Sequence, residues 1–74
     1  MLSKVFLTFP QKLIKEPILY DLAKRFPVKT NIRGASVTDV IALVALQIDG
    51  DRKDVEGAIA HLTELGVQVE RLAD

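Results

Sequence analysis

The chain has 74 residues, and its ten Lys and Arg balance its ten Asp and Glu, so a generally basic surface that attracts nucleic acids is not expected. It contains no cysteine, which excludes disulfides, iron–sulfur clusters and a cysteine nucleophile. No apolar run approaches the roughly 18 residues that cross a bilayer, and the first residues lack the apolar region of a signal peptide. We therefore expect a cytoplasmic protein that does not insert directly into a membrane.

The first predicted strand covers residues 3–9, where strongly apolar side chains recur at every second position. A helix is predicted over residues 17–26, because Pro17 suits the first helical position, where its missing N–H is not needed. Pro27 ends this helix. Its apolar stripe consists of Ile18, Leu19, Leu22 and Phe26.

Two further strands are predicted over residues 28–36 and 40–48. Gly34 interrupts the first of them and indicates a β-bulge or a close approach by another backbone. In the second strand, the apolar residues at even positions are expected to face the helices: Ala42, Val44, Leu46 and Ile48. The residues at odd positions form a nearly equally apolar row on the opposite face: Ile41, Leu43 and Ala45, followed by Gln47.

A turn at Asp49-Gly50-Asp51 precedes the second predicted helix, in which Asp51 is the expected N-cap. Gly66 is expected to close this helix in a left-handed conformation, and residues 67–72 predict the last strand. The buried stripe of the helix is predicted to consist of Val55, Ala58, Ile59, Leu62 and Leu65.

This order of elements indicates a single α+β domain over residues 1–74. The expected fold is a ferredoxin-like βαββαβ sandwich, with a four-stranded antiparallel sheet and two helices on one face. A domain this small buries only about 60% of the surface of its unfolded chain, so association with a second copy is expected. The predicted core consists of Val5, Leu7, Ile18, Leu22, Val44, Leu46, Val55, Ile59, Leu62 and Val69.

The apolar row Ile41, Leu43 and Ala45 is the predicted interface of a homodimer, because the open face of such a sheet is normally half-solvated. The alternative is a simple excess of aliphatic residues in a segment that strongly favours strand.

No catalytic residue is predicted, because no nucleophile–base or acid–base pair is visible, and an enzyme is not expected. His61 has no second histidine or cysteine to act with, so we interpret it as a surface residue and predict no metal site. No glycine-rich phosphate loop occurs, and no cofactor is predicted. RNA-binding domains of this fold stack bases on aromatic residues of the central strands, where this chain offers only Phe6, so no nucleic-acid partner is expected.

Asn31 is the main candidate for ligand binding, because its amide offers donors and an acceptor at the start of an otherwise apolar strand. It could instead cap the strand end or bond the local backbone. Arg33 lies two residues further and is expected on the same side, where it could clamp a carboxylate. A solvated edge-strand arginine is the alternative for this residue.

Residues 15–32 and 57–72 resemble the NIL domain family, which is named for an Asn-Ile-Leu motif. The motif reads Asn31-Ile32-Arg33 here, so its third position departs from the family name. The resemblance extends from about Val5 to Leu72. Its most specific pieces are Glu16-Pro17, Asn31-Ile32, Asp49-Gly50 and the segment Gly66-Val67-Gln68-Val69-Glu70.

The NIL family includes the C-terminal domains of ATPase subunits of methionine ABC importers, where the domain binds methionine at a contact between domains. The resemblance therefore implies a methionine ligand oriented by Asn31, with Ile32 lining an apolar pocket for the thioether.

A second branch of the family precedes a ferredoxin module in proteins of sulfur assimilation. The sequence that follows the motif resembles this branch, at Ala35, Val37, Thr38 and Asp39. Because this chain has no cysteine, any electron transfer would belong to a partner.

The sequence is therefore consistent with two functions. The first is a binding and regulatory module for methionine or a related sulfur amino acid, linked to methionine uptake or sulfur metabolism. The second is a ligand-free interaction module that docks in a sulfur-assimilation or transporter complex.

Overall fold

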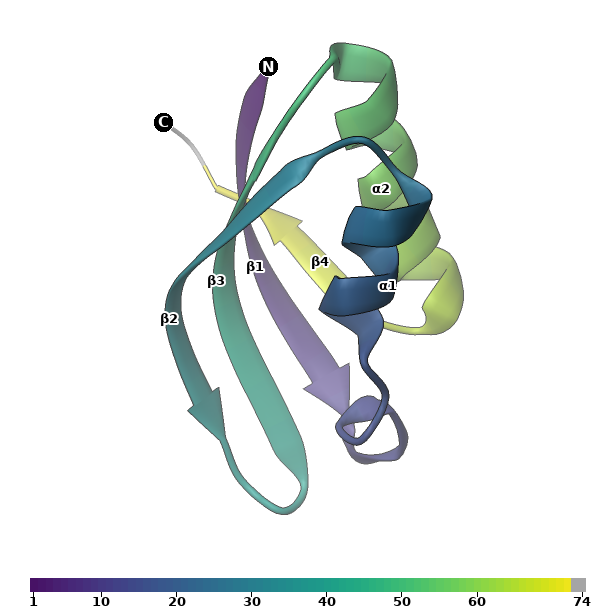
Figure 1. Cartoon of the computed structure of the whole chain (residues 1–74). Coiled ribbons are helices and arrows are strands. Elements are labelled where there is room, and N and C mark those ends of the chain that lie inside the picture. The colour runs from purple at the N-terminus through teal and green to yellow at the C-terminus, as the bar shows by residue number, and fades with distance from the viewer. Residues whose placement is uncertain (73–74) are drawn as a thin grey trace.

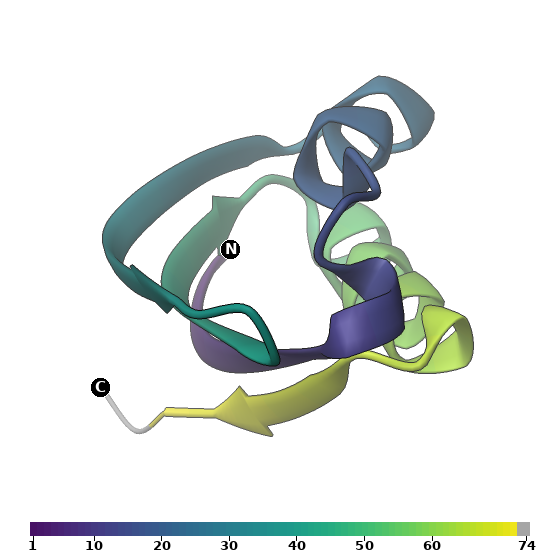
Figure 2. The same cartoon turned by 90° about the horizontal axis from the view of Figure 1, so that it is seen from below.

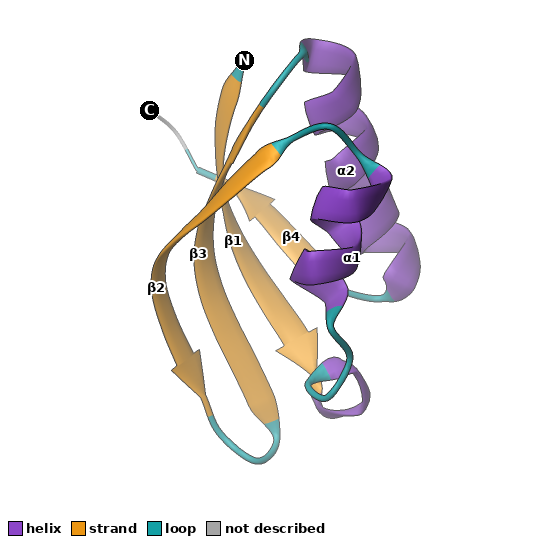
Figure 3. Cartoon of the chain, viewed as in Figure 1, coloured by secondary structure: helices purple, strands orange, loops and turns teal. Residues whose placement is uncertain are grey.

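The computed structural model describes residues 1–72 and contains a four-stranded sheet and two α-helices (Figure 1). The strands lie side by side in the order β2-β3-β1-β4, and each neighbouring pair is antiparallel. Both α-helices cover the same face of the sheet (Figure 3), so the predicted ferredoxin-like α+β fold is confirmed. In chain order the elements are β1 (Leu2–Pro10), the 3-10 helix η1 (Gln11–Leu13), α1 (Ile18–Arg25), β2 (Lys29–Val37), β3 (Ile41–Asp49), α2 (Arg52–Leu65) and β4 (Gln68–Arg71).

The core lies between the helices and the face of the sheet that they cover, which we call the inner face. The opposite, helix-free face is the outer face. The register of the central strands sets Val5 opposite Leu46, and both side chains are buried on the inner face. All predicted core residues are buried except Val69, which is half-buried because β4 is a short edge strand.

Two details of the helices correct the sequence prediction. Leu65 is exposed rather than buried, because it is the last residue of α2 and the chain turns away at Gly66. Phe26 is not helical, since α1 ends at Arg25 and the Phe26 backbone is extended. Its ring packs against α2, with its centroid 5.8 Å from that of His61, and a Cβ on Gly57 would lie 3.0 Å from it.

The helix ends follow their expected residues in part. Pro17 occupies the N-cap of α1, so the helix begins at Ile18 and not at the proline. Asp51 stands at the N-cap of α2, although its side chain forms no capping hydrogen bond. Gly66 adopts the predicted left-handed conformation, with φ of 102°.

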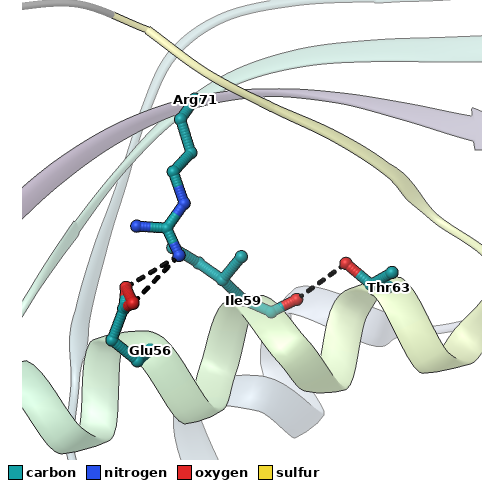
Figure 4. A network of polar contacts seen from close by, with 4 residues as sticks. All are labelled: Glu56, Ile59, Thr63 and Arg71. Atoms are coloured by element: carbon teal, nitrogen blue, oxygen red, sulfur yellow. Dashed lines mark hydrogen bonds and ion pairs between the residues drawn. The ribbon is translucent and has the colours of Figure 1, made fainter.

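One ion pair joins the last strand to the second helix, as Figure 4 shows. The Nη2 atom of Arg71 lies 2.7 Å from one carboxylate oxygen of Glu56 and donates to the other at 3.1 Å. On the same helix, the Thr63 hydroxyl donates to the carbonyl of Ile59. Both partners of the ion pair are exposed to solvent, so it contributes at most about 1 kcal/mol.

Strand β2 forms one edge of the sheet and curves away from the helices (Figure 2). Its pairing with β3 shifts register between Ile32 and Gly34, which makes Arg33 the extra residue of a β-bulge. The bulge predicted near Gly34 is thus confirmed. No other atom would lie within 4 Å of a Cβ on Gly34, so a close backbone approach does not explain this glycine.

None of the helices within residues 1–72 combines the length and the apolar character needed to span a bilayer.

Candidate functional site

Asn31 lies on the outer face of the sheet. It pairs with Gln47 of β3, and Gln47 lies between Leu46 and Ile48, which are both buried on the inner face. Partners in a strand ladder share a face, so Asn31 and Gln47 both point away from the helices. The Asn31 side chain forms no hydrogen bond within the described residues, which leaves its amide open to a ligand.

A row of polar side chains crosses the outer face at this level. Gln47 pairs on its other side with Lys4 of β1, so the row runs from Asn31 through Gln47 to Lys4. The neighbouring row contains Ala45 and Phe6, which face each other in the same ladder. Amide and ammonium groups therefore lie next to an apolar strip on one surface.

Arg33 joins this surface through the bulge. A hollow of about 260 Å³ is lined by Lys4, Arg33, Ala45, Gln47 and Leu72, with contributions from Val5 and Leu46. The structure thus brings Arg33 to the same hollow as the cross-strand partner of Asn31. We refer to this site as the outer hollow.

Ile32 lies on the other face from Asn31. It pairs with the buried Leu46, so it points toward the inner face, where it remains 55% exposed. A small ligand that contacts Asn31 on the outer face would not reach Ile32 without bending round the strand edge. Of the three residues predicted for ligand binding, the structure therefore places Asn31 and Arg33 on one face and Ile32 on the other.

The predicted dimer row also lies on the outer face. Ile41 is 38% exposed, whereas Leu43 and Ala45 are half-buried. The ladder flanks Leu43 with Ser36 on one side and Thr8 on the other. The apolar row is therefore narrow, with polar residues along part of its length.

A second hollow, of about 270 Å³, opens on the inner face, and we call it the inner pocket. It lies between the first turn of α1 and the end of the sheet where β2 and β3 are joined. Its volume is nearly the same as that of the outer hollow, so size does not distinguish the two sites. The inner pocket is lined by Phe9, Leu13, Ile14, Glu16, Pro17, Ile18, Leu19, Tyr20, Val37, Ala42 and Val44.

Chemistry distinguishes the two hollows. A zwitterionic amino acid needs partners for both an ammonium and a carboxylate, and the outer hollow offers cations and an amide. The inner pocket offers one carboxylate and otherwise almost entirely apolar walls. We therefore take the outer hollow as the candidate site for an amino acid.

His61 is half-buried beside the Phe26 ring, which corrects its interpretation as a surface residue. In the part of the chain that the structure describes, no three His, Cys, Asp or Glu side chains gather in a way that could hold a metal ion.

These observations define a small ferredoxin-like domain with an open polar hollow on its sheet. The NIL domain family model matches residues 4–71, so the chain belongs to the NIL domain family.

The chain is also similar to a solved structure, the C-terminal domain of an ABC transporter / ATP-binding protein from Enterococcus faecalis. The TM-score is 0.87 at 21% sequence identity, and the match covers 97% of this chain and 84% of that chain. At this identity, the likeness shows a shared fold. A tripeptidase from Staphylococcus aureus also matches, with a TM-score of 0.44 at 17% identity, over 95% of this chain and 29% of that chain. This match is too weak to show a shared fold. No curated protein matches the sequence significantly.

Proposed function

We propose that this domain binds methionine or a related sulfur amino acid and regulates methionine uptake or sulfur metabolism from the cytoplasmic side. The observation that carries the proposal is the polar row Asn31, Gln47 and Lys4 beside the apolar strip of Ala45 and Phe6. Membership of the NIL family and the shared fold with a domain of an ABC transporter protein support a connection with transport. No catalytic step is part of this proposal.

Each group of the amino acid has a partner at the outer hollow. The guanidinium of Arg33 and the ammonium of Lys4, which both line the hollow, suit the ligand carboxylate. The amide oxygen of Gln47, in the hollow, and that of its ladder partner Asn31, beside it, suit the ligand ammonium. Ala45 and Phe6 offer an apolar surface to the flexible thioether chain. Because the hollow lies on the helix-free face of the sheet, a monomer would hold the ligand weakly.

Formation of a homodimer would strengthen ligand binding at the outer hollow. The dimer row Ile41, Leu43 and Ala45 shares the outer face with the hollow, so a homodimer formed there would cover part of the ligand. Excluding water from the ligand would strengthen its ionic hydrogen bonds.

Calorimetric titration with L-methionine up to millimolar concentration tests the proposal. We expect saturable heats for the wild type and a Kd at least about tenfold higher for Asn31→Ala, since a hydrogen bond to a charged group contributes about 1.5–3 kcal/mol. The melting temperature without ligand should stay nearly unchanged, because the Asn31 side chain has no hydrogen bond to lose.

Ser36→Ala is the matched control, because Ser36 is an exposed outer-face residue of the same strand but pairs with Leu43, which does not line the outer hollow, whereas Asn31 pairs with the lining residue Gln47. Its Kd should equal that of the wild type. Flat heats with an unshifted melting temperature would contradict methionine binding.

The ligand-free interaction module is the second candidate, and the exposed edge strand favours it. Within residues 1–72, β2 pairs only with β3, so one side of the strand is open to a strand from another protein. A flat methionine titration would make this the better function.

A further inference from the structure

The inner pocket arises from the cross-strand row Phe9, Ala42 and Val37. Ala42 pairs with both of the larger residues, and all three belong to the inner face. The small side chain in the middle of the row leaves a depression between its neighbours. Helix α1 has only eight residues and begins after Pro17, so it borders this depression without filling it.

The pocket is also open to solvent at its rim. Val37 and Tyr20 both line it, and each is 63% exposed. The loop residues Leu13 and Ile14 form a further wall and pack against the core. A ligand could therefore enter past β2 and still reach the buried residues at the floor.

The charge at the rim of the inner pocket favours a cationic ligand. Glu16 is the only charged side chain among the described residues that line the pocket. The nearby Lys24 is held over the Tyr20 ring, with its Nζ atom 4.9 Å from the ring centroid, and does not line the pocket. A cationic group is thus favoured at Glu16, and a ligand carboxylate would be repelled there.

We propose that the inner pocket binds a small hydrophobic amine, with its carbon chain between Phe9, Ala42 and Val37 and its ammonium group at Glu16. This site lies on the opposite face of the sheet from the outer hollow and is independent of methionine binding. The volume of about 270 Å³ lies just below the usual range of ligand pockets, which suits a short branched chain.

Titration with 3-methylbutylamine tests the proposal, with methyl NMR signals of Leu13, Val37 and Val44 as the readout. The matched probes are 3-methyl-1-butanol, which is neutral, and 3-methylbutanoate, which is anionic. We expect the amine to bind most tightly, the alcohol next and the acid least. Equal binding of amine and acid, or no shifts at the pocket methyls, would overturn the proposal.

Glu16→Gln should raise the Kd of the amine by up to about fivefold and leave that of the alcohol unchanged, because an exposed ion pair contributes modestly. Glu64→Gln is its control, since Glu64 is exposed on α2 and does not line the pocket. An equal loss of affinity in both variants would show that the effect is one of overall charge and would contradict the role of Glu16.

A second pair of variants tests the place of binding. Val37→Lys puts a cation at the rim and should weaken the amine, whereas Val40→Lys has the same exposed starting residue, outside the pocket, and should not. Asn31→Ala should leave amine binding at the inner pocket intact. The amine proposal can therefore be tested separately from methionine binding at the outer hollow. Loss of amine binding in Asn31→Ala with retention in Val37→Lys would overturn the assignment.

Discussion

At the scale of single residues, Leu62 shows how the second helix packs against the sheet. Its side chain is fully buried and belongs to the same stripe as Val55, Ala58 and Ile59. Its carbonyl also accepts the N–H of Val67, where the chain leaves the helix. One residue therefore fills the core and lies at the turn toward β4.

Leu62→Ala should lower the free energy of unfolding by about 2–5 kcal/mol, because it removes a buried side chain and leaves a cavity. Urea denaturation measures this loss. Leu65→Ala is the control, since Leu65 lies three residues further on the same helix but is exposed, and it should cost much less. Equal losses in the two variants would contradict the observed helix face.

Of the residues that the sequence indicates for ligand binding, Arg33 lines the outer hollow and Asn31 pairs with its lining residue Gln47. Whether they bind a ligand stays a prediction. Lys4 and Gln47 are not indicated by the sequence, because only the pairing of three strands brings them to this surface. The face of Ile32 was equally hidden, because the motif is contiguous in sequence while a strand divides it between two faces. Register decides which side chains meet, and the sequence shows it only indirectly.

At the scale of elements, the turn between β2 and β3 depends on Thr38. Its hydroxyl oxygen accepts the N–H groups of Val40 and Ile41 at 3.4 and 3.2 Å, and the hydroxyl lies 3.2 Å from the Ile41 carbonyl oxygen, to which it donates. This side chain therefore closes the loop that joins the two strands lining both hollows.

Thr38→Val keeps the shape of the side chain and removes these bonds, so we expect a loss of about 1 kcal/mol. For a domain of this size, that lowers the melting temperature by about 4–8 °C, measured by circular dichroism. Thr63→Val is the control, because it removes only one bond within a helix and should cost less. An unchanged melting temperature in Thr38→Val would show that the turn forms without the hydroxyl.

The elements themselves were largely predictable, because the sequence has clear two-residue and helical periods and strong stop signals at Pro27 and Gly66. The inner pocket was not predictable. It depends on the length of α1 and on Ala42 lying between Phe9 and Val37, which are far from each other in the sequence. Phe26 shows a different limit: its spacing continues the apolar stripe of the helix, but its backbone is extended, as is favoured for a residue that precedes a proline.

At the scale of the whole molecule, the two faces of the sheet differ in how they are covered. The helices bury the inner face of β1 and β3, whereas the outer face has no covering layer within residues 1–72. The outer row Ile41, Leu43 and Ala45 is the part of this face at which we expect a second copy to pack.

We predict a homodimer through this row, with a mass near twice 8.2 kDa by light scattering at micromolar concentration. Leu43→Lys should shift the mass toward the monomer, because it puts a charge in the middle of the row. Glu64→Lys on α2 is the control and should leave the dimer intact. A monomeric wild type in which solvent reaches Leu43 would contradict the prediction.

The bulge at Arg33 has a consequence for the length of the chain. Asn31 and Ile32 precede the bulge, and Gly34 to Val37 follow it. The side chains on each side of the bulge point to their present faces of the sheet only because Arg33 has no partner in β3. Omitting Arg33 would give a regular strand in which each remaining side chain keeps its present face. Omitting a paired residue of β2 elsewhere would instead reverse the faces of the residues on one side of the gap. Arg33 is thus the position in β2 at which the chain can be one residue shorter while the other side chains keep their faces of the sheet. The outer hollow would then lose one of its two positive charges and keep that of Lys4.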